Sequence, residues 1–138
     1  MVSVIPGTRK VVDLNYLESM QSINRAILNP AFFLVFMGSP LVLAVSTFQQ
    51  INSGSIFWFL LAATITYLFG TFGVTVLGNV PLNDALDTLP LEEVGEAKIT
   101  AFRKSYEGKW NRLHLIRTVF SVLSFMLSLL GAFSQLKF

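Results

Sequence analysis

Between Arg25 and Asp84 the chain has no Asp, Glu, Lys, Arg or His. The surface of a soluble domain of this size needs charged groups that face water, so this gap excludes a soluble globular fold. Two bilayer crossings need about 40 apolar residues, and the gap holds them on either side of the polar segment 49–55. The missing charge therefore predicts an integral membrane protein whose main partner is the lipid bilayer.

Other absences narrow the chemistry. The chain has no cysteine, which excludes disulfides, thiolate metal sites, iron–sulfur ligation and cysteine nucleophiles. With a single histidine, His114, a histidine-based metal site would need carboxylate partners or a second subunit. The net charge of +2 and the lack of a Lys/Arg run argue against nucleic acid as a partner. No phosphate-binding loop, GxSxG or HExxH motif occurs, and the sequence predicts neither a metal site nor a cofactor.

The residues that are present fit a membrane bundle. The hydrophobic fraction is 53% and the mean hydropathy is +0.62. Only 13% of the residues are charged, against about 25% in soluble domains. The pattern predicts an all-α integral membrane helical bundle with transmembrane helices at 31–48, 56–78 and 113–136. Pro81 is expected to end the second of these helices, and residues 79–112 are expected to form a polar loop followed by a helix.

Residues 13–28 have the period of an amphipathic helix rather than of a membrane span. Asp13 is placed to cap its start, and Asn29-Pro30 is expected to end it. Asn24 falls within the apolar arc of this helix and Gln21 lies near the edge of that arc. An amide there must find a partner or cost about 1–3 kcal/mol. The segment is therefore expected to lie along the membrane interface or against the bundle.

Basic residues near the spans predict the orientation in the cell membrane. Three crossings put the N-terminal segment and residues 79–112 on one side. That side holds eight basic residues, which are Arg9, Lys10, Arg25, Lys98, Arg103, Lys104, Lys109 and Arg112, whereas the other side holds only Lys137. The positive-inside rule therefore predicts that residues 79–112 are cytoplasmic.

One polar stripe stands out at the start of the third span. On a helix, Trp110, His114, Arg117, Ser121, Ser124 and Ser128 fall within an arc of about 80°. The opposite face is apolar, so the stripe is expected to face the bundle interior. Arg117 could instead extend to the headgroups while His114 remains at the interface. A functional site and this simpler arrangement both fit the pattern.

The second span offers a complementary surface. Thr64, Thr71 and Thr75 form a stripe with Tyr67 beside it, and glycines at 70, 73 and 78 allow a neighbouring helix to approach closely. Small and hydroxyl-bearing residues commonly hold membrane helices together, although Tyr67 could also donate a hydrogen bond into a cavity. Asn79 and Asn83 flank Pro81, where they could cap helix ends or belong to a site.

Three motifs carry a family resemblance. QSINRAILNP (21–30), NVPLNDAL (79–86) and WNRLHLIRT (110–118) resemble the motifs of a family of small integral membrane proteins that includes the anthrone oxygenases of aromatic polyketide pathways. The resemblance spans nearly the whole chain and implies a four-helix membrane fold. It implies oxidation by molecular oxygen without an evident metal or flavin motif. The polar positions carried over by the resemblance are Gln21, Asn24, Asn29, Asn79, Asn83, Trp110, His114 and Arg117.

Two functional hypotheses follow. In the first, the protein oxidises a hydrophobic aromatic small molecule. His114 then removes a proton, Arg117 stabilises the oxyanion, asparagines orient that oxyanion, and Trp110 lines the pocket. In the second, the protein is a non-enzymatic accessory subunit or small-molecule binder whose buried polar network fixes helix register. A transporter fits less well, because paired repeats and matching broken helices are absent.

The chain departs from the family pattern at its start. Relatives carry a complete membrane helix before the segment that aligns with SVIPGTRK, and here only MVSVIP corresponds to it. This predicts either an internal start or a form with three spans instead of four. A three-span form would expose one face of the bundle and would favour a homodimer.

Overall fold

The computed structural model describes residues 10–134, and these residues form helices and connecting turns without any strand. The elements are α2 (Asp13–Ile27), α3 (Pro30–Gln49), α4 (Ser55–Thr66), the π-helices η1 (Tyr67–Gly73) and η2 (Thr75–Asn79), α5 (Val80–Asp87) and α6 (Glu96–Phe133). Three continuous helices, Pro30–Gln49, Ser55–Asp87 and Glu96–Phe133, are long and apolar enough to cross a membrane. The predicted all-α membrane bundle is confirmed. The segment 1–6 and Lys137, which the sequence analysis singled out, lie outside the described residues.

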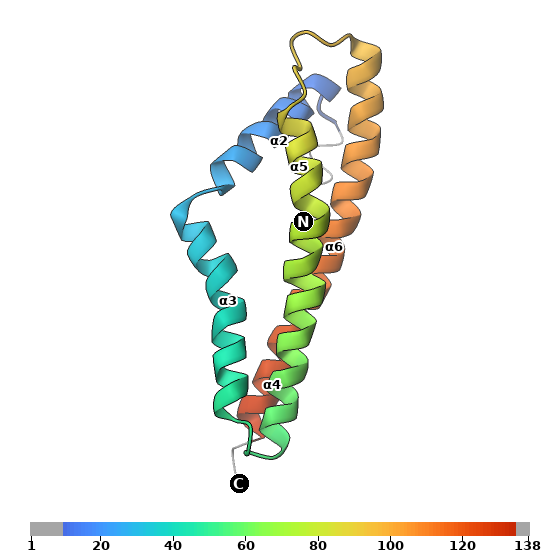
Figure 1. Cartoon of the computed structure of the whole chain (residues 1–138). Coiled ribbons are helices and arrows are strands. Elements are labelled where there is room, and N and C mark those ends of the chain that lie inside the picture. Colours follow the sequence, from blue (N-terminus) through green and yellow to red (C-terminus); the bar gives the residue numbers. More distant parts are fainter. Residues whose placement is uncertain (1–9, 135–138) are drawn as a thin grey trace.

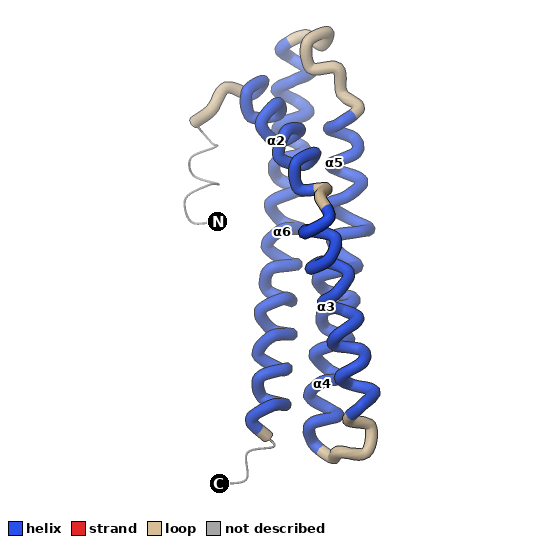
Figure 2. Tube along the Cα trace, turned by 90° about the vertical axis from the view of Figure 1, so that its left-hand side faces the viewer, coloured by secondary structure: helices blue, strands red, loops and turns tan. Residues whose placement is uncertain are grey.

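The molecule is an elongated stem with a head at one end. The helices from α4 to α5 form one rod that runs beside α6, while α3 packs on α4 near the turn 50–54 and diverges from the rod toward the other end (Figure 1). The tube view shows α2 lying across the same end as α5 and the start of α6 (Figure 2). The 38 residues of α6 extend for about 57 Å, well beyond a hydrocarbon core of about 30 Å. We call α2, α5, the turn 88–95 and residues 96–110 of α6 the head, and the remainder the stem.

The head has its own hydrophobic core. Its buried members are Tyr16, Leu17, Met20, Leu86, Leu91, Ile99 and Tyr106. They come from all four parts of the head, so the core holds α2 against α5 and α6. Burial, with Glu107 nearby, raises the pKa of Tyr16 to about 12, and its hydroxyl therefore stays protonated at neutral pH. On α2, Ile23 and Ile27 remain exposed, which shows that only part of the predicted apolar arc packs on the protein.

The prediction that Asp13 caps α2 is wrong. The N-cap is Val12, and Asp13 is the first residue of the helix. The Asp13 carboxylate instead accepts hydrogen bonds from Thr100 Oγ1 at 2.6 Å and from Arg103 Nη1 at 2.7 Å, both on α6. Arg103 is only 7% exposed and also donates to Glu107 at 3.2 Å. A buried guanidinium needs anionic partners, so this cluster takes the carboxylate away from its own helix end.

The Asp13 contact predicts an acid-sensitive head. The hydrogen bond from Thr100 and the neighbouring Arg103 hold the pKa of Asp13 below its ordinary value of 3.8. A carboxyl group with a lowered folded-state pKa stabilises the fold above its unfolded pKa, and this stabilisation is lost as the pH falls through the lower, folded value. We expect Tm to drop below about pH 4 in the wild type and to drop less in Asp13→Asn. Thermal unfolding followed by circular dichroism from neutral to acidic pH checks this, and an unchanged pH profile in Asp13→Asn would contradict it.

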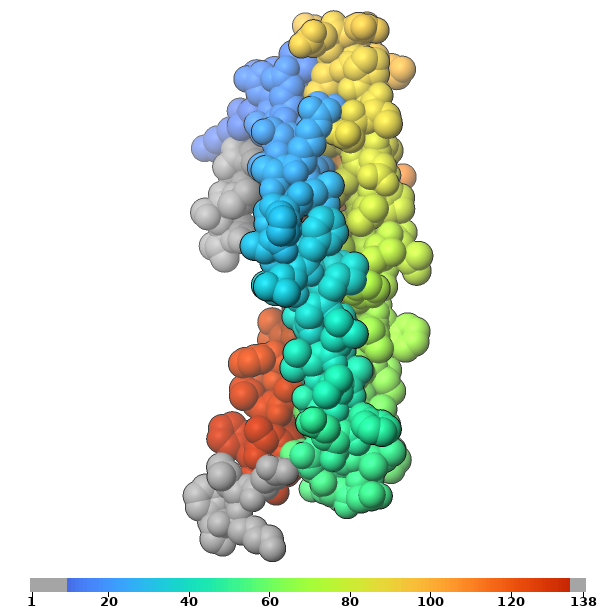
Figure 3. Space-filling view, turned by 60° about the vertical axis from the view of Figure 1, so that its left-hand side comes forward, coloured from blue at the N-terminus to red at the C-terminus, as the bar shows by residue number. Residues whose placement is uncertain are grey.

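Hydroxyl groups and glycines hold the stem together. Thr47 and Thr64 share a hydrogen bond of 2.8 Å between α3 and α4, and Ser124 Oγ donates to the Ala63 carbonyl at 2.8 Å. A Cβ placed on Gly70 would lie 2.1 Å from ring atoms of Phe120, so the helices touch at that glycine. The close approach predicted for the second span is therefore present. In the space-filling view, α3 lies along the front of the rod and the last part of α6 lies beside α3 near the turn 50–54 (Figure 3).

The contact at Gly70 makes a reciprocal prediction. Gly70→Ala is expected to destabilise the stem by about 1–3 kcal/mol, because Phe120 must move to admit the methyl group. Phe120→Ala in the same chain removes the two ring atoms but keeps the Phe120 Cβ, 2.5 Å from the added methyl, so it should recover only part of that loss. Gly38→Ala is the matched control, since a Cβ there meets nothing within 4 Å. Tm values in one detergent compare the four proteins, and a double variant no more stable than Gly70→Ala would contradict the assigned contact.

The expectation that Pro81 ends the second span is wrong. The helix continues through Pro81 to Asp87. Proline in a helix removes a donor and clashes with the carbonyl four residues earlier. Here the helix is wound as a π-helix over Thr75–Asn79, immediately before the proline, and the wider turn accommodates the ring. The rod consequently carries Asn83 into the head, while Asn79, the last residue of η2, lies where the stem meets the head.

Candidate functional site

A continuous series of polar contacts runs from α2 through the head into the stem. We call it the polar chain, and its members are Asn24, Tyr106, Asn83, Trp110, His114 and Arg117. Asn24 Nδ2 donates to Tyr106 Oη at 3.2 Å, and Tyr106 Oη donates to Asn83 Oδ1 at 3.1 Å. Trp110 Nε1 donates to the same Asn83 oxygen at 3.1 Å. The polar chain thereby links α2, α5 and α6.

The lower part of the polar chain stacks along α6. The rings of Trp110 and His114 are stacked with centroids 4.9 Å apart and planes 18° apart. Arg117 approaches His114 Nδ1 with Nε at 2.9 Å and Nη2 at 2.7 Å. A guanidinium only donates hydrogen bonds, so Nδ1 must accept, and the proton of the neutral imidazole lies on Nε2. His114 is therefore left with a donor and no free acceptor.

The amide of Asn83 is fixed in orientation by its two partners. Its oxygen accepts from both Tyr106 and Trp110, and a flipped amide would place its NH₂ group against two donors. The Asn83 Nδ2 group is therefore the end left for another molecule. Asn83 Nδ2, His114 Nε2–H and the guanidinium N–H groups not bound to His114 are donors along the polar chain, and such donors suit an electron-rich oxygen.

Asn79 lies one helical turn before Asn83, and its side chain has no hydrogen-bond partner among the described residues. It is 2% exposed, and neither Nδ2 nor Oδ1 makes a hydrogen bond within the described part of the chain. Each buried unpaired group costs about 1–3 kcal/mol. The cost falls at the end of η2, and short π-helical segments are frequent at functional sites.

Comparison with known proteins identifies the family. Residues 25–127 match the model of the anthrone oxygenase family. The chain belongs to the anthrone oxygenase family. No curated protein and no solved structure matches it. The match includes Asn79, Asn83, Trp110, His114 and Arg117, and it begins just after Asn24.

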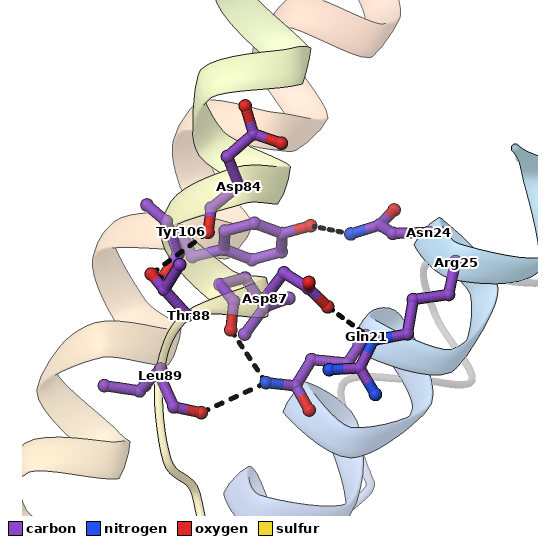
Figure 4. A network of polar contacts seen from close by, with 10 residues as sticks. Gln21, Asn24, Arg25, Asp84, Asp87, Thr88, Leu89 and Tyr106 are labelled. Carbon is purple, nitrogen blue, oxygen red and sulfur yellow. Dashed lines mark hydrogen bonds and ion pairs between the residues drawn. The ribbon is translucent and has the colours of Figure 1, made fainter.

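Two residues carried over from the family resemblance join helix ends in this anthrone oxygenase family member. Gln21 Nε2 donates to the carbonyls of Leu86 at 2.7 Å and Leu89 at 3.2 Å, so it caps the end of α5 (Figure 4). Asn29 Oδ1 accepts from the Phe32 backbone N–H at 3.0 Å and caps the start of α3. Both side chains are used in joining helices, and neither is part of the polar chain.

Tyr67, which was expected at the site, is not part of the polar chain, whereas Tyr106 is. Tyr67 is half-buried in η1 and makes no hydrogen bond to any described residue, so it lies apart from the polar chain. Tyr106, which the sequence analysis did not select, is the central link of that chain. A signal for it exists, because Tyr106 precedes Trp110 and His114 at intervals of four residues on the same helix face.

The cavities near the head lie away from the lower polar chain. One of about 520 Å³ is lined by Asp13, Arg103, Lys104 and Glu107, and another lies beside Gln21 and Arg25. Neither is lined by His114 or Arg117. Among residues 10–134, no group of three or more His, Asp or Glu side chains is placed to hold a metal ion. The groups of the polar chain themselves offer hydrogen bonding and charge stabilisation.

Proposed function

We propose that this protein is a membrane oxygenase that uses molecular oxygen to oxidise a hydrophobic aromatic small molecule. The observation that carries the proposal is the Arg117–His114–Trp110 stack, in which an aromatic surface adjoins an array of hydrogen-bond donors. Membership of the anthrone oxygenase family supports the substrate class. The substrate reaches the site from the bilayer, where such a molecule concentrates.

The reaction is the conversion of a methylene carbon between aromatic rings to a carbonyl. The methylene first loses a proton to water at the head–stem boundary. This gives a delocalised anion whose charge lies on the oxygen of the carbonyl opposite the methylene. The carbanion reduces dioxygen and forms a carbon–oxygen bond. The resulting peroxide anion takes up a proton from water, and the hydroperoxide then loses water, so the carbon gains one oxygen atom and the second oxygen atom leaves in water. Arg117 and His114 Nε2–H stabilise the oxyanion.

This scheme changes the role first assigned to His114. The sequence suggested a base, but Nδ1 accepts from Arg117 and Nε2 bears the proton. An imidazole held in this way has no lone pair for a substrate proton. We therefore assign His114 as an oxyanion donor whose tautomer is fixed by Arg117.

A non-enzymatic role is the second candidate, and one observation favours it. The upper polar chain pairs Asn24, Tyr106, Asn83 and Trp110 with one another, as expected of a network that fixes the register of three helices. An accessory subunit or small-molecule binder would need no more than this. Under either candidate we place the protein in the cell membrane with the head in the cytoplasm, because the head and its flanks hold most of the basic residues.

Isotope labelling separates the two candidates. The full chain in lipid nanodiscs is supplied with an anthrone, a tricyclic aromatic with a methylene opposite a carbonyl, under ¹⁸O₂. The proposal predicts formation of the quinone with one ¹⁸O atom at a rate well above that in empty nanodiscs. A rate equal to that in empty nanodiscs would exclude the oxygenase and leave the non-enzymatic role.

A further inference from the structure

Asn79 holds two buried polar atoms that no described residue satisfies. We infer that Asn79 forms a recognition site for a hydroxyl group on an aromatic ligand. The inference rests on the proposed function only for the aromatic body of that ligand. It goes further by naming the ligand group that the site selects.

None of the neighbouring polar groups pairs with the Asn79 side chain. Thr75 lies one turn before Asn79, and its hydroxyl donates to the Thr71 carbonyl at 2.7 Å. The Thr71 hydroxyl is 3.0 Å from that of Ser121. On the other side, the Asn83 oxygen already accepts two hydrogen bonds. The partner of Asn79 therefore comes from outside this set.

A hydroxyl group matches what Asn79 offers. The amide presents one free donor, Nδ2, and one free acceptor, Oδ1. A carbonyl oxygen could satisfy only the donor, whereas a hydroxyl both accepts and donates. Water does so too, but a buried water usually makes about three hydrogen bonds. Next to Asn79, the apolar side chain of Leu113 packs closely on Gly78, where an added Cβ would lie 2.9 Å from it, so these surroundings offer a water no polar partner.

The segment around Asn79 is open to the bilayer on one side. Val80, the residue after Asn79, is 42% exposed, whereas Leu77, which is 82% exposed, lies on the opposite side of the helix. η2 packs against α6, while α3 packs on α4 and η1, farther along the rod. A hydrophobic ligand dissolved in the bilayer can therefore reach the exposed side of η2 beside Val80 without passing through water.

Binding of a matched pair of probes tests the inference. The full chain in nanodiscs is titrated with 1-naphthol and with naphthalene, and partition into empty nanodiscs is subtracted. The wild type is expected to prefer 1-naphthol by at least about tenfold, as in sites built to pair with a hydroxyl. Asn79→Leu should lose that preference and, because the unpaired amide is gone, raise Tm by about 4 °C. Thr75→Val, which removes a buried hydroxyl already paired within its own helix, should keep the preference.

Two results would overturn the inference. One is a wild type without preference between the probes, and the other is an Asn79→Leu protein that retains the preference, as expected if the partner is water. If Asn79→Leu does not fold, Asn79→Ala is titrated in its place. Because binding needs no turnover, a hydroxyl preference that depends on Asn79 in a protein without oxygenase activity would sink the proposed function alone. Turnover together with an Asn79-independent preference would sink the Asn79 inference alone.

Discussion

His114→Ala is expected to lower kcat for an aromatic substrate by about 10²–10³-fold, the usual cost of losing one oxyanion donor. His114→Gln should stay within about tenfold of the wild type, because a glutamine amide can accept from Arg117 and still donate to the oxyanion. A base could not be replaced in this way, since an amide does not take up a proton. Oxygen consumption and quinone absorbance in nanodiscs measure both variants.

Arg117→Met completes this comparison by removing the donor to His114 Nδ1. We expect a loss of at least the size seen for His114→Ala, because both the guanidinium and the fixed tautomer disappear. Ser128→Ala is the control, since that hydroxyl lies on the same helix and donates only to the Ser124 carbonyl of its own helix. If His114→Gln were as inactive as His114→Ala, the donor role would be wrong and the base role would return.

Leu17→Ala is expected to destabilise the head by about 2–5 kcal/mol, which is the cost of emptying a fully buried leucine position. Leu17 is 0% exposed and lies in the core that joins α2 to α5 and α6. Loss of this packing should also loosen the Asn24–Tyr106 contact, since Asn24 lies on the same helix. Hydrogen exchange of the α2 amides and the Tm of the whole protein measure the two effects.

Ile23→Ala is the matched control for this change. Ile23 lies on the same helix but is 54% exposed, so its truncation should alter Tm little and leave α2 protected from exchange. Equal losses in Leu17→Ala and Ile23→Ala would mean that α2 is held by its exposed side as much as by the head core.

The arrangement of the spans could be predicted because hydropathy and helical period depend only on local sequence. The stripe on α6 behaves as its wheel indicates, with Ser124 buried and Leu115, Val119 and Leu123 exposed. Asn24 was expected to need a partner and has one in Tyr106. These predictions succeed because a lipid-facing helix and a polar group in an apolar arc each have few ways to be satisfied.

The features that could not be predicted depend on hydrogen bonds between distant residues or on small changes of helix winding. Asp13 pairs with Arg103, 90 positions away, and nothing in the local sequence prefers that pairing to a helix cap. The π-helical turns that carry the rod through Pro81 shift the hydrogen bonds by one residue without a signature in composition. The lack of a hydrogen-bond partner for Asn79 depends on the same helix winding and could not be predicted from the sequence either.

The role that we assign to Arg117 and His114 is to stabilise the anion of a bound aromatic substrate. An absorbance titration of an anthrone bound to the wild-type protein, in nanodiscs and without oxygen, measures this directly. We predict that the anion band appears at a pH lower by at least about one unit than in empty nanodiscs, and that Arg117→Met abolishes this difference. An anion that forms at the same pH in wild-type and empty nanodiscs would contradict the claim.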